Sequence, residues 1–336
     1  MKAEGRRRKA EGSRQKAVGS RRPKTKDQRP KTKGQRPKTK IPDLRSRYLD
    51  KTKTQTPKTS GRARVLTAVV VLPFLIASII VPQLWWLFVA MAGAALTLGL
   101  FEFYKLAKRR DMKPNVVAMY LSGSAIFTVF LFNESNEFVN VLLLQAILLV
   151  LIIGTLVAAT FQEVNFEKMI ASCGATILGV LYVALLGSHL VAVRTGFNPT
   201  LSTRLLSFFF LILMGSDIGA YYVGRLIGKH KLAPKISPGK TWEGVAGGIV
   251  AALAMATVAH FWFFRELPLK WALPLAAIMT VLGVLGDLAE SALKRGAGAK
   301  DAASILPGHG GILDRLDSLL FNAPLIYYFG RFYFNT

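Results

Sequence analysis

Long apolar blocks follow the first 64 residues of this chain, and they limit what it can fold into. We distinguish about nine of them, at residues 65–82, 83–103, 115–133, 138–160, 169–193, 205–224, 244–264, 271–290 and 313–333. One helical crossing of a bilayer needs roughly 20 apolar residues, and inside lipid only helices or closed barrels satisfy the backbone hydrogen bonds. The blocks have helix length. The sequence therefore predicts an all-α, polytopic integral membrane protein with about nine transmembrane helices, built from residues 65–336.

The first 64 residues are basic and repetitive. They hold 24 of the 44 Lys and Arg residues but only 5 of the 19 Asp and Glu residues, and the run RPKTK recurs at 22–26, 29–33 and 36–40. Such a segment buries too little apolar surface to offset the entropy of ordering, so we predict a disordered polybasic tail, 1–64. Its charge suits contact with anionic lipid. The same charge attracts nucleic acid, but we expect no specific nucleic-acid partner, and a plain solubilising extension is an equal alternative.

The charge of the connecting loops indicates an orientation. If the tail lies in the cytoplasm, nine alternating crossings place the basic loops 105–113, 228–240 and 294–315 on the side of the tail, and the acidic turn 133–137 on the other side. Cytoplasmic loops of membrane proteins carry an excess of Lys and Arg. We therefore expect the N-terminus and these three loops to be cytoplasmic.

The most polar stretch outside the tail is 291–317, SALKRGAGAKDAASILPGHGGILDRLD, directly after an apolar block that carries Asp287. Positions 287, 290, 291 and 294 share one helical face by their spacing, as do Asp314 and Asp317 at the start of the next block. An ionisable group inside an apolar helix is costly and indicates a function, which applies to Asp287 and to Asp217. A structural ion pair with a nearby Arg or Lys is the alternative, and it has more weight for Asp217 than for Asp287. Carboxylates from two helix ends would form an oxygen-lined site of the kind that Mg²⁺ prefers.

Cations outnumber carboxylates around these positions and indicate a strongly anionic ligand, since Arg suits bidentate phosphate contact. They are Lys240, Lys294, Arg295, Lys300 and Arg315. A glycine-rich turn, 308–311, precedes the helix expected to start near residue 313, and a helix N-terminus favours anions. The segment SPGKTWEG, 237–244, reads as a turn leading into a span, with Lys240 as a phosphate contact; ordinary capping next to the membrane has about even odds.

The stretch 291–317 closely resembles the signature of the CDP-diacylglycerol synthase (phosphatidate cytidylyltransferase) family. The matching residues are Ser291, Lys294, Arg295, Lys300, Asp301, Pro307, His309, Gly310, Gly311, Asp314, Arg315 and Asp317. The segments GDLAES, ISPGKTWEG and AYYVGRLIGKHKLAP resemble companion segments of the same family, which more often has Lys at the position of Gly239. The resemblance covers about residues 65–335 and leaves the tail out.

The resemblance implies the reaction of CTP with phosphatidic acid to give CDP-diacylglycerol and pyrophosphate, in phospholipid biosynthesis. It implies Mg²⁺ at Asp287 and Asp314, and it leaves open a second, monovalent cation. We expect catalytic roles for Lys294, Arg295, Lys300, Asp301, His309, Arg315 and Asp317, and substrate binding by Ser237, Lys240, Thr241, Ser291, Gly310 and Gly311. A homodimer in the plasma (inner) membrane of a bacterium is the expectation that follows.

Other functions fit the sequence less well. A CTP-dependent lipid-alcohol kinase would transfer the γ-phosphoryl group instead of the cytidylyl group. A transporter of anionic solutes could use Asp217 and Asp287, but such folds carry internal repeats with broken helices, and we see no repeat. No DG-x-x-AR run supports a CDP-alcohol phosphotransferase, and no P-loop or serine-hydrolase motif occurs.

Overall fold

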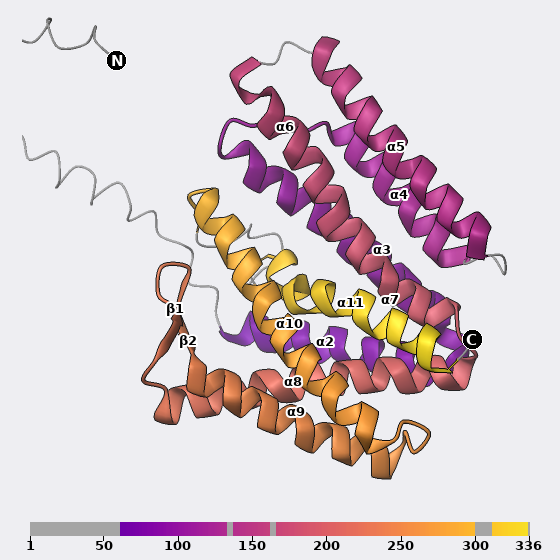
Figure 1. Cartoon of the computed structure of the whole chain (residues 1–336), viewed down its shortest axis with the longest axis vertical. Helices are drawn as coiled ribbons and strands as arrows, with labels where there is room; N and C mark the ends of the chain where they lie inside the picture. The colour runs from indigo at the N-terminus through magenta and orange to yellow at the C-terminus, as the bar shows by residue number, and fades with distance from the viewer. Residues whose placement is uncertain (1–60, 133–136, 162–165, 300–310, 335–336) are drawn as a thin grey trace, which may run out of the picture. The chain divides into compact units, whose positions relative to one another are not determined.

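The computed structural model describes residues 61–132, 137–161, 166–299 and 311–334, all within one compact unit, Pro57–Thr336. Residues 1–60 of the predicted disordered tail lie outside the described part. In chain order the elements are α2 (Gly61–Ile80), η1 (Pro82–Leu84), α3 (Trp85–Lys108), α4 (Val116–Phe132), α5 (Glu137–Phe161), α6 (Phe166–Gly179), η2 (Val180–Leu185), α7 (Leu186–Thr195), α8 (Pro199–Ile227), β1 (Lys231–Ala233), β2 (Ser237–Thr241), α9 (Trp242–Trp262), α10 (Leu269–Gly296) and α11 (Leu313–Phe334) (Figure 1).

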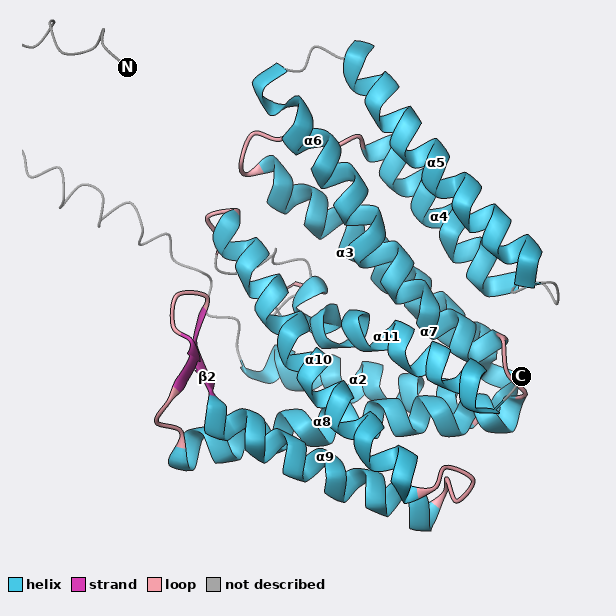
Figure 2. Ribbon diagram, viewed as in Figure 1, coloured by secondary structure: helices cyan, strands magenta, loops and turns pink. Residues whose placement is uncertain are grey.

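The prediction of a helical integral membrane protein is confirmed (Figure 2). Six described helical segments are long and apolar enough to cross a bilayer: Pro82–Lys108, Phe138–Phe161, Phe166–Thr195, Pro199–Ile227, Trp242–Trp262 and Leu269–Gly296. The apolar parts of α2 and α4 are shorter, and α11 begins with charged residues. The predicted number of nine spans is therefore not confirmed.

One predicted span contains a change of helix type. The segment Phe166–Thr195 runs from α6 through the π-helical turn η2 into α7. A π-helical turn inserts an extra residue into the helix and shifts the faces on either side of it. The residues on the α7 side of the turn, Leu186–Thr195, are mostly buried. The buried helix α7 packs against α11.

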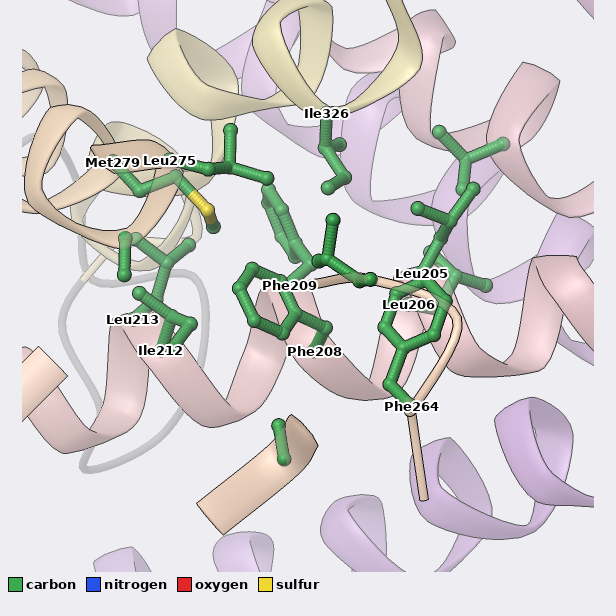
Figure 3. Close-up of a cluster of buried hydrophobic side chains, with 14 of the residues drawn as sticks. Leu205, Leu206, Phe208, Phe209, Ile212, Leu213, Phe264, Leu275, Met279 and Ile326 are labelled. Carbon is green, nitrogen blue, oxygen red and sulfur yellow. The ribbon is translucent and has the colours of Figure 1, made fainter. Parts of the chain in front are cut away.

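Tight packing of large side chains holds α8, α10 and α11 together. Phe208, Phe209 and Ile212 of α8 are buried against Met279 of α10 and Ile326 of α11 (Figure 3). Because lipid tails are as apolar as these side chains, the close packing itself stabilises such a cluster inside a membrane. The cluster fixes the relative positions of three helices whose polar residues lie further along.

Glycines allow α8 and α9 to approach closely. A Cβ atom at Gly219 would clash with Ala251 and with the carbonyl oxygen of Gly247, and a Cβ at Gly247 would clash with Val223. Small residues at such a crossing are typical of membrane helix pairs. The close approach sets the spacing between the ends of α8 and α9, where the polar residues of the 215–244 segment are found.

A two-stranded antiparallel hairpin connects α8 to α9, in the segment where a turn was predicted. Lys231 pairs with Thr241 and Ala233 pairs with Ser237. The hairpin passes directly into α9, whose first turn is capped by Thr241: its Oγ1 accepts a hydrogen bond of 3.1 Å from the amide of Gly244. The capped junction holds the neighbouring Lys240 at a fixed place beside α8 and α10.

Candidate functional site

A cavity of about 660 Å³ lies where α8, β2, α9, α10 and α11 meet. Its polar lining consists of Asp217, Tyr221, Arg225, Lys240, Thr241, Asp287, Asp314, Asp317 and Ser318. Glycines on four of these elements complete the wall. The cavity therefore combines four carboxylates with two cations, at the ends of helices that the apolar cluster holds in place.

Three carboxylates gather between α10 and α11. Asp287, Glu290 and Asp317 each place an oxygen atom so that all three atoms lie within 4.8 Å of one another. Asp287 and Glu290 come from the helical face that the sequence predicts, and Asp317 reaches them from α11. The helices cross closely there, since a Cβ atom at Gly286 would overlap the carbonyl oxygen of Asp317.

Carboxylates this close repel one another unless a cation or a proton compensates their charge. Glu290 is fully buried, and its Oε1 atom has no hydrogen-bond partner among the described residues. A buried carboxylate oxygen without a donor is costly. The cluster offers three carboxylate oxygens, and Glu290 adds a buried oxygen that lacks a hydrogen-bond donor. Hard divalent cations in proteins are bound by oxygen atoms of this kind. Asp287, Glu290 and Asp317 are thus suited to hold a divalent cation.

Lys294 forms ion pairs with one carboxylate of α10 and one of α11. Its Nζ atom lies 2.5 Å from Glu290 Oε2 and 2.6 Å from Asp314 Oδ1. The other oxygen of Asp314 accepts a hydrogen bond of 3.1 Å from the amide of Gly311. Asp314 is therefore held by two donors of the protein. The metal site that the resemblance implies pairs Asp287 with Asp314, whereas the carboxylates that cluster in the described residues include Asp317 instead.

Lys240 of the hairpin reaches across the cavity to α10. Its Nζ atom lies 2.5 Å from Asp287 Oδ2 and 3.4 Å from the carbonyl oxygen of Val284, to which it donates. Ser291 donates a hydrogen bond of 3.3 Å to the other oxygen of Asp287. Asp287 therefore belongs to the carboxylate cluster and is also the ion-pair partner of Lys240. Lys240 could leave Asp287 and contact a phosphate instead.

The structure brings together part of the predicted site. Lys240, Thr241, Asp287, Asp314 and Asp317 line the cavity, whereas Ser237, Ser291, Lys294, Arg295, Gly311 and Arg315 are absent from its lining. Lys300, Asp301, His309 and Gly310 lie outside the described residues. Arg295 donates to the carbonyl oxygens of Ile236 and Ala299, at 3.4 and 3.5 Å, which ties the end of α10 to the hairpin.

Sequence reasoning missed Glu102, a fully buried residue of α3. Its two carboxylate oxygens accept hydrogen bonds from the amides of Ile312 and Leu313, at 2.9 and 2.8 Å. These amides open α11, and a negative charge stabilises the N-terminus of a helix. Glu102 thus fixes the turn that precedes Asp314. The signal was present, because an acidic residue inside an apolar block indicates a function.

Replacing Glu102 should loosen the start of α11. We expect Glu102→Ala to lower turnover by about tenfold or more and to lower the melting temperature, since two buried amides lose their acceptors at about 1–3 kcal/mol each. Glu102→Gln should be milder because its amide oxygen still accepts one hydrogen bond. Thermal unfolding in detergent and the Mg²⁺ dependence of turnover measure both effects. Glu266→Gln, at an exposed ion pair with Arg204, is the control and should change neither.

Comparison with known proteins relates this chain to a family. Residues 62–333 match the sequence profile of the cytidylyltransferase family. The chain is 34% identical over 273 residues to the phosphatidate cytidylyltransferase of Bacillus subtilis, covering 80% of this chain and 96% of that protein. It is 32% identical over 290 residues to the phosphatidate cytidylyltransferase of Haemophilus influenzae, with 80% and 98% covered. The protein of that name from Pseudomonas aeruginosa is 33% identical over 269 residues, with 79% and 94% covered.

Proposed function

The chain belongs to the cytidylyltransferase family, and from this premise we propose that it transfers the cytidylyl group of CTP to phosphatidic acid. The products are CDP-diacylglycerol, for phospholipid biosynthesis, and pyrophosphate. Relatives named phosphatidate cytidylyltransferase match it over most of their length. The observation that carries the proposal is the carboxylate cluster of Asp287, Glu290 and Asp317, of which Asp287 and Asp317 line a cavity that also holds two cations.

The proposed chemistry is a direct displacement. A phosphate oxygen of phosphatidate forms a bond to the α-phosphorus of CTP, and the bond between that phosphorus and the oxygen leading to the β-phosphorus breaks, so that pyrophosphate leaves with the electron pair. The nucleophile is already an anion and needs no base. Catalysis then rests on positioning two anions and neutralising their charge.

Residues that line the cavity and residues beside it divide this work. Asp287, Glu290 and Asp317 would hold Mg²⁺, which when bound supplies positive charge to the triphosphate. Asp314 would keep Lys294 in place beside them, and it is also the metal ligand that the resemblance implies. Lys240 would exchange its contact with Asp287 for a phosphate oxygen as substrate binds. Lys294, Arg295 and Lys300 would neutralise the triphosphate, and catalytic roles for Asp301, His309 and Arg315 stay predictions.

The setting of the enzyme is a bacterial membrane. The six long apolar helices support an integral membrane protein, and the three relatives named above are bacterial. We place the hairpin and the start of α11 on the cytoplasmic side, where CTP is available, with phosphatidate arriving within the leaflet. The homodimer, the contact of the tail with anionic lipid and a second, monovalent cation stay predictions.

Product analysis with α-³²P-labelled CTP tests the function. We expect the purified protein, with phosphatidate and Mg²⁺, to place the label in a lipid product and to release unlabelled pyrophosphate. A lipid-alcohol kinase would instead transfer label only from γ-labelled CTP. If membranes that contain the folded protein do not label lipid from α-labelled CTP, the proposal is contradicted. Omission of Mg²⁺ in the presence of a chelator should stop the reaction.

A further inference from the structure

We infer that Arg225 and Tyr221, on α8, form the binding site for the phosphate group of the lipid substrate. The inference rests on the proposed function and assigns one of the two substrates to a particular part of the cavity. Neither residue is among the site residues predicted from the sequence, although both belong to the segment AYYVGRLIGKHKLAP that resembles the family. Both line the cavity, and the guanidinium of Arg225 donates a hydrogen bond of 2.8 Å to the hydroxyl of Tyr221.

Arg225 carries a charge that no carboxylate among the described residues balances. Two cations line the cavity, Arg225 and Lys240. Lys240 is paired with Asp287 at 2.5 Å, and Lys294, just behind the lining, is paired with Glu290 and Asp314. Among the described residues, Arg225 is the cavity cation that forms no ion pair with a carboxylate. Its charge therefore remains for a ligand, and the remaining N–H groups of its planar fork suit a phosphate.

Arg225 and Tyr221 lie on the cavity face of α8, near its C-terminal end. Asp217, Tyr221, Gly224 and Arg225 share one face of the helix and line the same cavity. Arg225 turns back one turn of the helix toward Tyr221, which lies about 6 Å along the axis from Asp217 at 1.5 Å per residue. A phosphate bound between Arg225 and Tyr221 would thus lie about one to two helical turns along α8 from the level of Asp217, on the wall of the same cavity. This is close enough for it to meet a nucleotide held there.

The surface around Arg225 is apolar and aromatic. Tyr222, Leu226 and Trp242 are 60%, 79% and 60% exposed. These residues lie at the ends of α8 and α9, which are long and apolar enough to span a membrane. Exposed apolar and aromatic side chains at such helix ends are suited to the lipid interface. Arg225 in the last turn of α8 can lie with its stem along this surface and its charged head toward the headgroups. A lipid phosphate that moves within the leaflet reaches this pair before it reaches the carboxylates.

The chemistry of the pair suits a phosphate monoester. The hydroxyl oxygen of Tyr221 accepts from Arg225, so the hydroxyl hydrogen of Tyr221 is available to donate to a phosphate oxygen. Arg225 can donate with its other N–H groups at the same time. The pair would thus offer the charged guanidinium of Arg225 and the neutral hydroxyl of Tyr221 to the same lipid headgroup. The nucleotide would occupy the end of the cavity with Lys240 and the carboxylate cluster.

Steady-state kinetics in mixed micelles test the assignment, with phosphatidate and CTP varied independently. We expect Arg225→Gln to raise the KM for phosphatidate about 10- to 100-fold, as for the loss of a hydrogen bond to a charged group, with the KM for CTP within about twofold of the wild-type value. Arg225→Lys should be intermediate because it keeps the charge but not the fork. Tyr221→Phe should raise the KM for phosphatidate a few-fold.

The control is Lys235→Gln, which removes one charge at the exposed turn of the hairpin, away from the cavity lining. It should leave both KM values unchanged, and melting temperatures verify folding. If Arg225→Gln does not fold, the Arg225→Lys and Tyr221→Phe variants carry the test. A rise in the KM for CTP alone, or no change in either KM, would overturn the assignment while the wild-type activity still stands. A wild-type protein that makes no CDP-diacylglycerol would instead contradict the proposed function.

Discussion

The Asp287→Asn variant is expected to insert into the membrane and fold, yet to lose Mg²⁺-dependent turnover by about a hundredfold or more. Asp287 is the carboxylate that joins the cluster with Glu290 and Asp317 and also pairs with Lys240. Replacing a residue that only supports a metal ligand lowers metal affinity or activity 10- to 100-fold. Loss of a ligand itself should lower activity at least as much. Initial rates across a range of Mg²⁺ concentrations measure the effect.

A matched variant separates this loss from a general effect of removing a charge. Asp111 lies at an exposed ion pair with Lys168 and has a positive φ of 54°, a conformation that Asn adopts readily. Asp111→Asn should therefore keep turnover and stability close to wild type. Near-normal activity of Asp287→Asn would show that the cavity carboxylate is not needed for the reaction.

Gly286→Ala is the second change with a large expected effect. An added Cβ atom would overlap the backbone carbonyl of Asp317, and a backbone atom cannot turn away as a side chain can. The helices α10 and α11 must then separate where Asp287 and Asp317 meet. We expect a destabilisation of about 1–3 kcal/mol and a fall in turnover of at least tenfold, measured by thermal unfolding in detergent and by the labelled-CTP assay.

Gly154→Ala is the matched control, because a Cβ atom at Gly154 of α5 would meet no atom within 4 Å. It should be neutral or slightly stabilising, since Ala favours a helix more than Gly does. A Gly286→Ala protein that is as active and as stable as wild type would mean that the close crossing of α10 and α11 does not position the carboxylates.

The long apolar blocks made the helical membrane architecture predictable, because helix length and backbone satisfaction in lipid leave few alternatives. The helical face shared by Asp287 and Glu290 followed from spacing alone, and the structure bears it out as part of one cluster. Residue spacing within one helix does not predict how two helices cross. Whether Asp314 or Asp317 faces Asp287 depends on how α11 rotates against α10, and that rotation is set by packing at Gly286.

Three other features needed the fold. Glu102 lies 210 residues from the amide of Ile312 that it binds, and no local pattern relates two such distant positions. The hairpin has strands of three and five residues, too short for alternation to be recognised between glycines and prolines. Arg225 stands out only once Lys240 and Lys294 are known to be paired with carboxylates.

The most direct test of this account is to locate the divalent ion itself. Crystals of the full chain grown with CTP and Mn²⁺ in place of Mg²⁺ would show the ion by its anomalous scattering. The account predicts one peak at coordination distance from carboxylate oxygens of Asp287 and Asp317, beside the phosphates of CTP. Bound CTP with its ion away from both of these carboxylates would contradict it.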